Sequence, residues 1–192
     1  MLKSTQKIFE TAKQCFFQHG YSASSIAMIS RYSKVSRVTI HKQFSSKEDL
    51  FRAFIENFLL EKDTEIQAYI NSPGMFWDDT SRFLAKRCTE VFDNIPSTII
   101  KADLIHAGQT YCADLIDKNR VKTRHAIGVK LQQAIDQQQV CLAKIGLVVE
   151  DFAANIESVA ESIMLSSAIQ DSRQTLQKTL DVYKVASWVE RS

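Results

Sequence analysis

Apolar residues recur at intervals of three and four along almost the whole chain, which is the pattern of amphipathic helices. Ile8, Ala12, Cys15 and Phe16 form the inner stripe of a first helix, and Gly20 is placed to end it. No segment of useful length alternates apolar and polar residues as a strand does. The sequence therefore predicts an all-α fold.

Two short helices and the start of a third are expected between residues 24 and 51. Ser25 and Ser36 each precede an apolar-periodic stretch and are good N-caps for the two short helices. Ile40 and Phe44 are four residues apart and can pack together on a core. Such a unit is typical of a helix-turn-helix, whose second helix enters the major groove of DNA. The packing of that helix turns the following residues toward solvent or a partner: Arg37, Val38, Thr39, Lys42 and Gln43.

These exposed residues have the chemistry that DNA reading requires. Arg, Lys and Gln side chains hydrogen-bond base edges, and a Val or Thr methyl group contacts thymine. Ser45 or Ser46 then caps a further helix beginning near Lys47. Lys47 and the free backbone N–H groups of that helix start are together suited to holding a phosphate.

About the first quarter of the chain resembles the DNA-binding domain of the tetracycline-repressor (TetR) family of bacterial transcription regulators. Three residues depart from the family pattern: Lys34 replaces the turn glycine, His41 a tyrosine and Gln43 a histidine. A left-handed backbone at Lys34 would cost about 1 kcal/mol relative to glycine. The matching positions are spaced over the whole segment: His19-Gly20-Tyr21, Ser24-Ser25-Ile26, Ile29, Val35-Ser36, Thr39-Ile40, Phe44, Ser46-Lys47-Glu48 and Leu50.

The resemblance implies a helix-turn-helix DNA-binding domain at residues 1–48 and a helical regulatory and dimerisation domain at residues 49–192. It also implies a homodimer on a palindromic double-stranded operator, with repression relieved by a small apolar or aromatic effector. The residues expected to face DNA phosphates are Ser25, Lys34, His41 and Lys47.

The rest of the chain reads as long helices, because glycine is sparse and only Pro73 and Pro96 interrupt it. The first of them ends before Asn71-Ser72-Pro73-Gly74, a strong helix breaker. The expected helices cover residues 47–69, 76–92, 97–116, 120–139, 149–169 and 172–189.

The last two helices carry apolar stripes that are broader than one edge of a small core requires. Either both stripes pack on their own body, or two such pairs form a four-helix bundle across a two-fold axis. The family resemblance favours the second arrangement. The interface candidates are Phe152, Ile156, Val159, Ala160, Ile163, Leu176, Leu180, Tyr183 and Trp188.

A small-molecule pocket in the body is implied by the resemblance, and aromatic walls with a few polar groups suit such a pocket. Taken singly, each candidate is more often an ordinary core residue, and this holds for a histidine within an apolar stretch. The pocket candidates are Phe76, Trp77, Phe83, Leu84, Ile105, His106, Gln109, Tyr111 and Cys112.

Charge is divided unevenly along the 192 residues, whose net charge is +2. Residues 1–52 hold nine Lys or Arg and three acids, a net +6, whereas residues 53–192 carry a net −4. A solvated charged face would explain a basic segment by itself. Together with the helix-turn-helix pattern, the basic head indicates a polyanionic partner.

Other classes of protein find little support. The four cysteines lack metal-ligand spacing, no phosphate-binding glycine loop occurs, and adjacent acids such as Asp78-Asp79 cannot converge on one helix face, so we expect no metal, cofactor or enzymatic activity. No apolar run approaches a signal peptide or a bilayer span, which predicts a cytoplasmic protein without membrane contact. The departures at Lys34, His41 and Gln43 keep one alternative open, namely a protein that retains the fold for protein interaction or for non-sequence-specific DNA binding.

Overall fold

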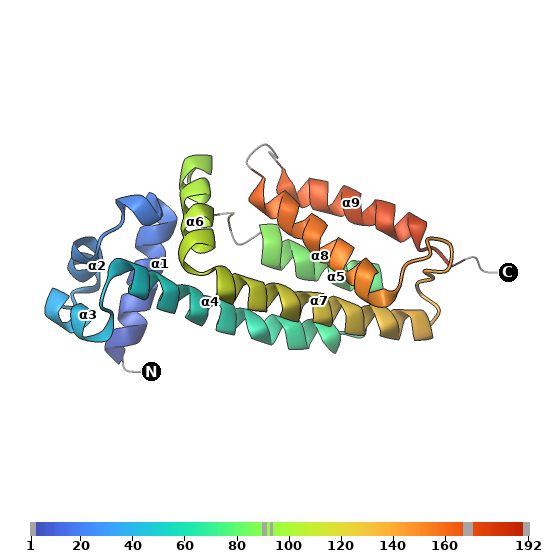
Figure 1. Cartoon of the computed structure of the whole chain (residues 1–192), viewed down its shortest axis with the longest axis horizontal. Coiled ribbons are helices and arrows are strands. Elements are labelled where there is room, and N and C mark those ends of the chain that lie inside the picture. The colour runs from blue at the N-terminus through green and yellow to red at the C-terminus, as the bar shows by residue number, and fades with distance from the viewer. Residues whose placement is uncertain (1–2, 90–91, 93, 167–170, 190–192) are drawn as a thin grey trace. The chain divides into compact units, whose positions relative to one another are not determined.

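The computed structural model describes residues 3–89, 92, 94–166 and 171–189. The regular structure of these residues is helical, without a strand, which confirms the all-α expectation (Figure 1). The α-helices are α1 (Lys3–Ala23), α2 (Ile26–Ser33), α3 (Arg37–Gln43), α4 (Lys47–Ile70), α5 (Phe76–Leu84), α6 (Thr98–Tyr111), α7 (Ala113–Asp136), α8 (Val149–Leu165) and α9 (Ser172–Ala186), and a π-helical turn, η1, covers Ala85–Thr89.

The chain divides into two compact units, each with its own apolar core. The first unit contains residues 1–60 and 94–117, and the second contains residues 61–93 and 118–192. The first unit is thus larger than the predicted head of residues 1–48, because it takes in more of α4 and the whole of α6. The physical reason is apolar packing, since Leu104 and Ala107 of α6 belong to the same core as the residues of α1.

Serine caps define the short helices of the first unit. The hydroxyl oxygen of Ser25 accepts a hydrogen bond from the Met28 N–H, and that of Ser36 accepts one from the Thr39 N–H. The start of α4 is capped in the same way by Ser46, whose oxygen accepts from the Asp49 N–H at 3.0 Å. These contacts confirm the predicted caps.

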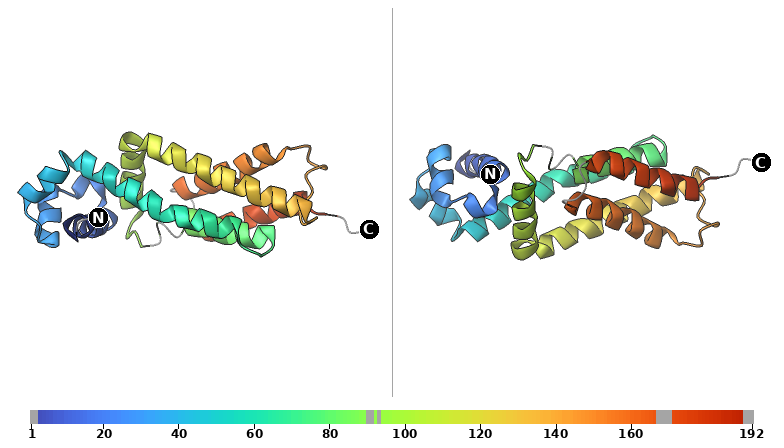
Figure 2. Two further views of the ribbon diagram at one scale, coloured as in Figure 1. Left: turned by 90° about the horizontal axis from the view of Figure 1, so that it is seen from below. Right: turned by 90° about the horizontal axis from the view of Figure 1, so that it is seen from above.

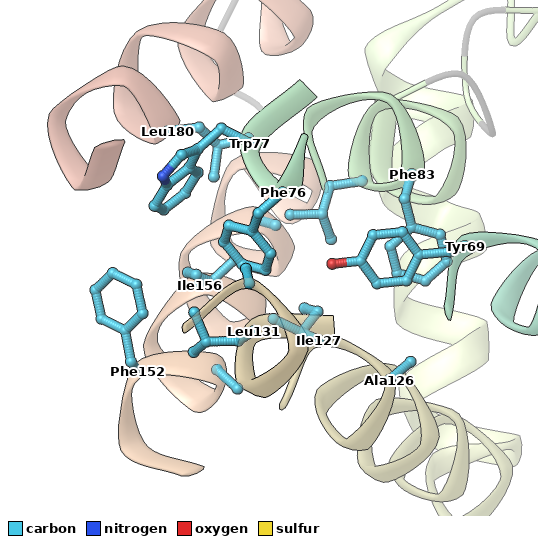
Figure 3. Close-up of a cluster of buried hydrophobic side chains, with 14 of the residues drawn as sticks. Tyr69, Phe76, Trp77, Phe83, Ala126, Ile127, Leu131, Phe152, Ile156 and Leu180 are labelled. Atoms are coloured by element: carbon cyan, nitrogen blue, oxygen red, sulfur yellow. The ribbon is translucent and has the colours of Figure 1, made fainter. Parts of the chain in front are cut away.

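The core of the second unit combines aromatic side chains, such as Phe76 and Trp77 of α5, with aliphatic ones, such as Ile127 and Leu131 of α7 (Figure 3). Tyr69 of α4 stacks on Phe83 of α5, with ring centroids 4.1 Å apart and ring planes 5° from parallel. Helices α8 and α9 lie side by side over this core, to which Phe152 and Leu180 contribute (Figures 1 and 2). Hydrophobic burial therefore explains most of the broad stripes on these two helices.

The predicted helix over residues 97–116 is wrong in its C-terminal part. Helix α6 ends at Tyr111, Cys112 has a non-helical backbone (φ −134°, ψ 18°), and α7 begins at Ala113. Arg52 of α4 braces this corner, because its guanidinium donates to the Tyr111 carbonyl at 3.0 Å and to the Asp114 carboxylate at 2.6 Å. The Cys112 side chain is fully buried in the core, so the break places a small apolar group inward.

Four other predicted helices end earlier than expected. Helix α5 ends at Leu84 and continues as η1, while residues 90 and 91 lie outside the described part of the chain. Helix α7 ends at Asp136 rather than residue 139, and Gln138 has a positive φ of 57°. Helix α8 ends at Leu165, while residues 167–169 of its predicted range are outside the described part, and α9 ends at Ala186 rather than residue 189.

Candidate nucleic-acid interface

The turn between α2 and α3 is held by side chains of α2. The Ser30 hydroxyl donates to the Val35 carbonyl at 2.7 Å, and the buried Ser33 accepts a hydrogen bond from the Val35 N–H at 3.2 Å. Lys34, between them, has the left-handed backbone conformation (φ 57°, ψ 24°) that glycine favours. The turn thus keeps its left-handed geometry with a lysine, whose exposed side chain adds positive charge to the surface.

Helix α3 buries one face and exposes the other. Ile40 is fully buried, whereas Arg37, Val38, His41 and Lys42 are exposed. The exposed fraction of Val38 is 66%, which is high for an apolar side chain. The side chains that the sequence assigned to base edges at the helix start therefore lie on the free surface of α3.

Thr39 and Gln43 are less free than these neighbours. The Thr39 hydroxyl lies 2.8 Å from the hydroxyl of the cap residue Ser36 and is half-buried. The Gln43 side-chain oxygen accepts a hydrogen bond from the Thr5 hydroxyl of α1 at 2.8 Å. Gln43 therefore ties the end of α3 to α1, a contact that sequence spacing does not signal.

Lys47 also has a partner inside its own unit. Its ammonium group donates to the Tyr21 carbonyl at 3.1 Å and lies 4.1 Å from the centroid of the Tyr21 ring. The Tyr21 hydroxyl in turn donates to the Glu48 carboxylate at 3.0 Å. Of the residues assigned to phosphates, Ser25, Lys34 and His41 are exposed, whereas Lys47 is partly buried against the end of α1.

The electrostatic surroundings of α3 favour an anionic partner. Residues 11–47 contain six Lys or Arg and no Asp or Glu. The basic side chains of Lys34, Arg37 and Lys42 are exposed in or around α3. Because no carboxylate of this segment offsets them, they give this surface a positive potential.

The nine predicted ligand-pocket residues are divided between the two units. Phe76, Trp77, Phe83 and Leu84 are buried in the core of the second unit. The other five belong to the first unit: Ile105 is half-buried, His106 and Gln109 are exposed, Tyr111 packs near the Tyr21 ring with centroids 5.2 Å apart, and Cys112 is buried.

A groove of about 640 Å³ in the second unit is lined by none of these nine residues. It lies at the connection between α7 and α8, where the walls are mainly aliphatic and include Val140, Leu142 and Val149. The groove could not be predicted from the sequence, because residues 137–148 carry no regular periodicity that would indicate which side chains gather.

The predicted dimer residues are for the most part covered by their own unit. Phe152, Ile156, Ala160, Ile163, Leu176 and Leu180 are buried, Val159 and Tyr183 are half-buried, and Trp188 is exposed. Two further apolar side chains of α9, Val182 and Val185, are exposed by 68% and 75%. Val182 could have been found from the sequence, because Val182, Val185 and Trp188 recur at intervals of three residues. This spacing marks a second apolar stripe at α9 and just after it.

Two other kinds of site, a membrane span and a metal site, are not found among the described residues. Their helices include none that combines the length and apolar character needed to cross a bilayer. Their His, Cys, Asp and Glu side chains form no group of three or more that is arranged to hold a metal ion.

Comparison with known proteins agrees with the geometry of the first unit. The family model described as "Bacterial regulatory proteins, tetR family" matches residues 8–54. The HTH-type transcriptional repressor AcnR of Corynebacterium glutamicum is 24% identical over 179 residues, which are 93% of this chain and 89% of that protein. The HTH-type transcriptional repressor ComR of Escherichia coli is 27% identical over 138 residues, which are 68% of this chain and 62% of that protein.

Solved structures extend the similarity to the whole fold. A TetR transcription regulator from Haloarcula marismortui has a TM-score of 0.78 at 16% identity, covering 98% of this chain and all of that one. The reduced form of NemR from Escherichia coli has a TM-score of 0.77 at 14% identity, covering 98% of this chain and 99% of that one. The family match over residues 8–54 assigns the helix-turn-helix of the first unit to the TetR family of bacterial regulatory proteins, and the solved structures show that the chain has the fold of TetR regulators.

Proposed function

We propose that this protein is a ligand-responsive transcriptional repressor that binds a palindromic operator as a homodimer in the cytoplasm. The observation that carries the proposal is the exposed, basic face of α3, which lies in a segment of residues 11–47 without a single acid. An α-helix fits the major groove, and a positive surface supplies the salt-dependent part of DNA affinity.

The residues expected to face DNA, in α3 and next to it, can be divided by their chemistry. We assign Arg37, Val38 and Lys42 to base edges, with the Thr39 methyl group beside them. Ser25, Lys34 and His41 are assigned to phosphates, which position the protein without reading sequence. Gln43 and Lys47 are assigned to holding α3 and the end of α1 in place, because Thr5 and Tyr21 already bind them.

The homodimer is supported by the outer stripe of α9. Val182, Val185 and Trp188 expose apolar area that a second copy would cover. A two-fold pair would place two recognition helices about 34–36 Å apart, one turn of B-DNA. Val185→Glu introduces a charge into this stripe and should convert the dimer to a monomer at micromolar concentration in sedimentation. The matched change Asp136→Asn on α7 should leave the mass unchanged.

Regulation would be a population shift in which an apolar or aromatic effector, bound in the helical body, favours a state that does not bind the operator. Operator affinity falls only as far as the effector prefers that state. The mainly aliphatic groove at the connection between α7 and α8 supports an apolar effector, because ligand pockets are lined predominantly by hydrophobic side chains. A compound that binds tightly and leaves operator affinity unchanged would speak against it as the effector.

The decisive experiment selects genomic DNA fragments with purified protein and footprints the bound ones. A palindrome with half-sites one helical turn apart is expected, together with an affinity that falls steeply with salt. Arg37→Ala should relax the preference at one base pair of each half-site, whereas the control Asp136→Asn should not. Binding without a discrete site would favour the alternative of a non-sequence-specific DNA-binding protein, and no binding to any duplex would refute the proposal.

A further inference from the structure

Helix α6 packs on α1 within the first unit, although residues 24–97 lie between them in the sequence. Leu104 and Ala107 supply the apolar part of this contact. Apolar packing is non-directional, so it does not by itself fix the position of one helix along another. The polar contacts of α6 with the rest of the first unit are directional and add to this packing.

Asp103 of α6 makes such contacts with residues 20–25, which comprise the end of α1 beyond its kink at Gly20 and the connection to α2. We call this segment the α1–α2 turn. One carboxylate oxygen accepts a hydrogen bond from the Ser22 N–H at 2.8 Å, and the other accepts one from the Ser22 hydroxyl. Burial alone would raise the pKa of Asp103, but the bonds from Ser22 and the charge of Lys47 lower it, so the carboxylate is ionised near neutral pH. Hydrogen bonds to an ionised group are stronger than neutral ones.

Gly20 makes room for this carboxylate. A Cβ atom at residue 20 would lie 2.5 Å from a carboxylate oxygen of Asp103, which is far inside contact distance. The backbone there also has φ 83°, which favours glycine. The sequence of the turn is thus matched to the presence of the α6 carboxylate.

The same turn determines where α2 begins. The Ser24 hydroxyl is buried and donates to the Gly20 carbonyl at 2.6 Å, and Ser25 caps α2. From the other side, Lys47 at the start of α4 donates to the Tyr21 carbonyl. The turn that leads into the helix-turn-helix is therefore held between α6 and α4.

We propose that Asp103 is a positioning residue for DNA binding, which fixes the α1–α2 turn through Ser22 and so holds α2 and α3 in the orientation that binds the operator. This inference rests on the proposed function. It assigns to a residue outside the helix-turn-helix an indirect effect on operator affinity.

The direction in which operator affinity changes when Asp103 is replaced distinguishes a positioning role from a simple effect of its charge. Removing a negative charge from a DNA-binding unit strengthens binding to a polyanion if nothing else changes. We expect the opposite for Asp103→Ala, which should weaken operator binding about tenfold through loss of its charged hydrogen bonds. Asp103→Asn should fall between this variant and wild type, because its amide oxygen still accepts the Ser22 N–H. Asp136→Asn, which removes an acid from an exposed position of α7, should not weaken binding.

A double-mutant cycle with Ser22 tests the route of the effect. Operator affinities are measured for Ser22→Ala, Asp103→Ala and the pair, each corrected for its active fraction by stoichiometric titration. The pair should bind no more weakly than Asp103→Ala alone, because both changes remove one contact. Fully additive losses, or wild-type affinity in Asp103→Ala, would overturn the proposal.

Hydrogen exchange gives a readout that needs no DNA. In Asp103→Asn the backbone amides of residues 21–36 should exchange faster, while those at the start of α1 keep their wild-type rates. Uniformly faster exchange over the first unit would mean general destabilisation and would count against a positioning role. If wild-type protein binds no duplex, the proposed function fails, and this measurement still decides whether Asp103 holds the turn.

Discussion

Thr5 of α1 donates its hydroxyl hydrogen to the side-chain oxygen of Gln43 of α3, across 2.8 Å and 38 residues of sequence. The exposed basic face of α3 begins at Arg37, and this bond holds its opposite end. A residue whose type suggests base reading thus has a partner within the protein. Whether Gln43 contacts a base edge or only holds α3 in place can be tested directly.

Thr5→Val and Gln43→Ala should weaken operator binding by similar amounts, each by about 1 kcal/mol, which is the usual net value of one hydrogen bond. Neither change should alter the base preference in a selection experiment, because the bond orients α3 as a whole. A loss of preference at one base pair in Gln43→Ala, with Thr5→Val behaving as wild type, would instead assign Gln43 to a base edge.

Lys47 and Lys34 form a natural pair for measuring salt dependence. Lys34→Ala should reduce the slope of log K against log salt by about 0.9, the value for one lost phosphate contact. Lys47→Ala should leave that slope unchanged and lower the free energy of unfolding by about 1–2 kcal/mol, because its ammonium group binds the Tyr21 carbonyl and ring. Equal reductions of slope in the two variants would show that Lys47 contacts phosphate in the complex.

Because Lys34 has a left-handed backbone, its replacement by glycine should change stability and DNA affinity in opposite directions. Lys34→Gly should raise the free energy of unfolding by about 1 kcal/mol, because glycine adopts φ 57° without the Cβ contact that strains lysine. Operator affinity should fall at the same time through the lost charge. Urea denaturation and DNA titration of the same preparation measure both effects, and Lys34→Ala is the control that loses the charge without relieving the strain. A Lys34→Gly variant less stable than wild type would show that the lysine side chain contributes more than the strain costs.

The features that could be predicted well from the sequence are those that depend on neighbouring residues. The caps at Ser25 and Ser36 depend on a few neighbouring residues, and the structure places them as expected. The break at Cys112 was missed because it depends on Arg52, which is distant in sequence. The partners of Gln43 and Lys47 were missed for the same reason, since a long polar side chain does not indicate whether it will meet solvent or another helix.

The second unit contains a buried ion pair that sequence position does not signal either. The ammonium group of Lys130 on α7 lies 3.3 Å from the Asp79 carboxylate of α5, and both side chains are at least 94% buried. Lys130 also donates to the Ser72 carbonyl and, at 3.0 Å, to the Ser72 hydroxyl. The pair thus joins α5 and α7 to the turn that follows α4.

Lys130→Met should lower the free energy of unfolding by about 3–5 kcal/mol, because it leaves the Asp79 carboxylate buried without its main partner. Asp79→Asn combined with Lys130→Met should cost less than Lys130→Met alone, since no charge then remains buried. Urea denaturation of the single and double variants measures the difference. A double variant as unstable as the sum of its single changes would show that the two residues act independently.

The Asp79 carboxylate should also give the second unit a specific acid sensitivity. Burial by itself would raise the pKa of Asp79, but the hydrogen bonds from Ser72 and Lys130 and the charges of Lys130 and Arg82 together lower it. A carboxyl whose folded pKa is lower than its unfolded pKa contributes stability that is fully present above the unfolded value, about 3.9, and is lost as the pH falls through the folded value. The stability difference between wild type and Asp79→Asn should therefore be largest near neutral pH and shrink below about pH 4. Chemical denaturation of both proteins between neutral pH and pH 3 isolates this contribution, because every other carboxyl titrates in both. A difference that stays constant over this range would show that the ionised form of Asp79 is not the one that stabilises the fold.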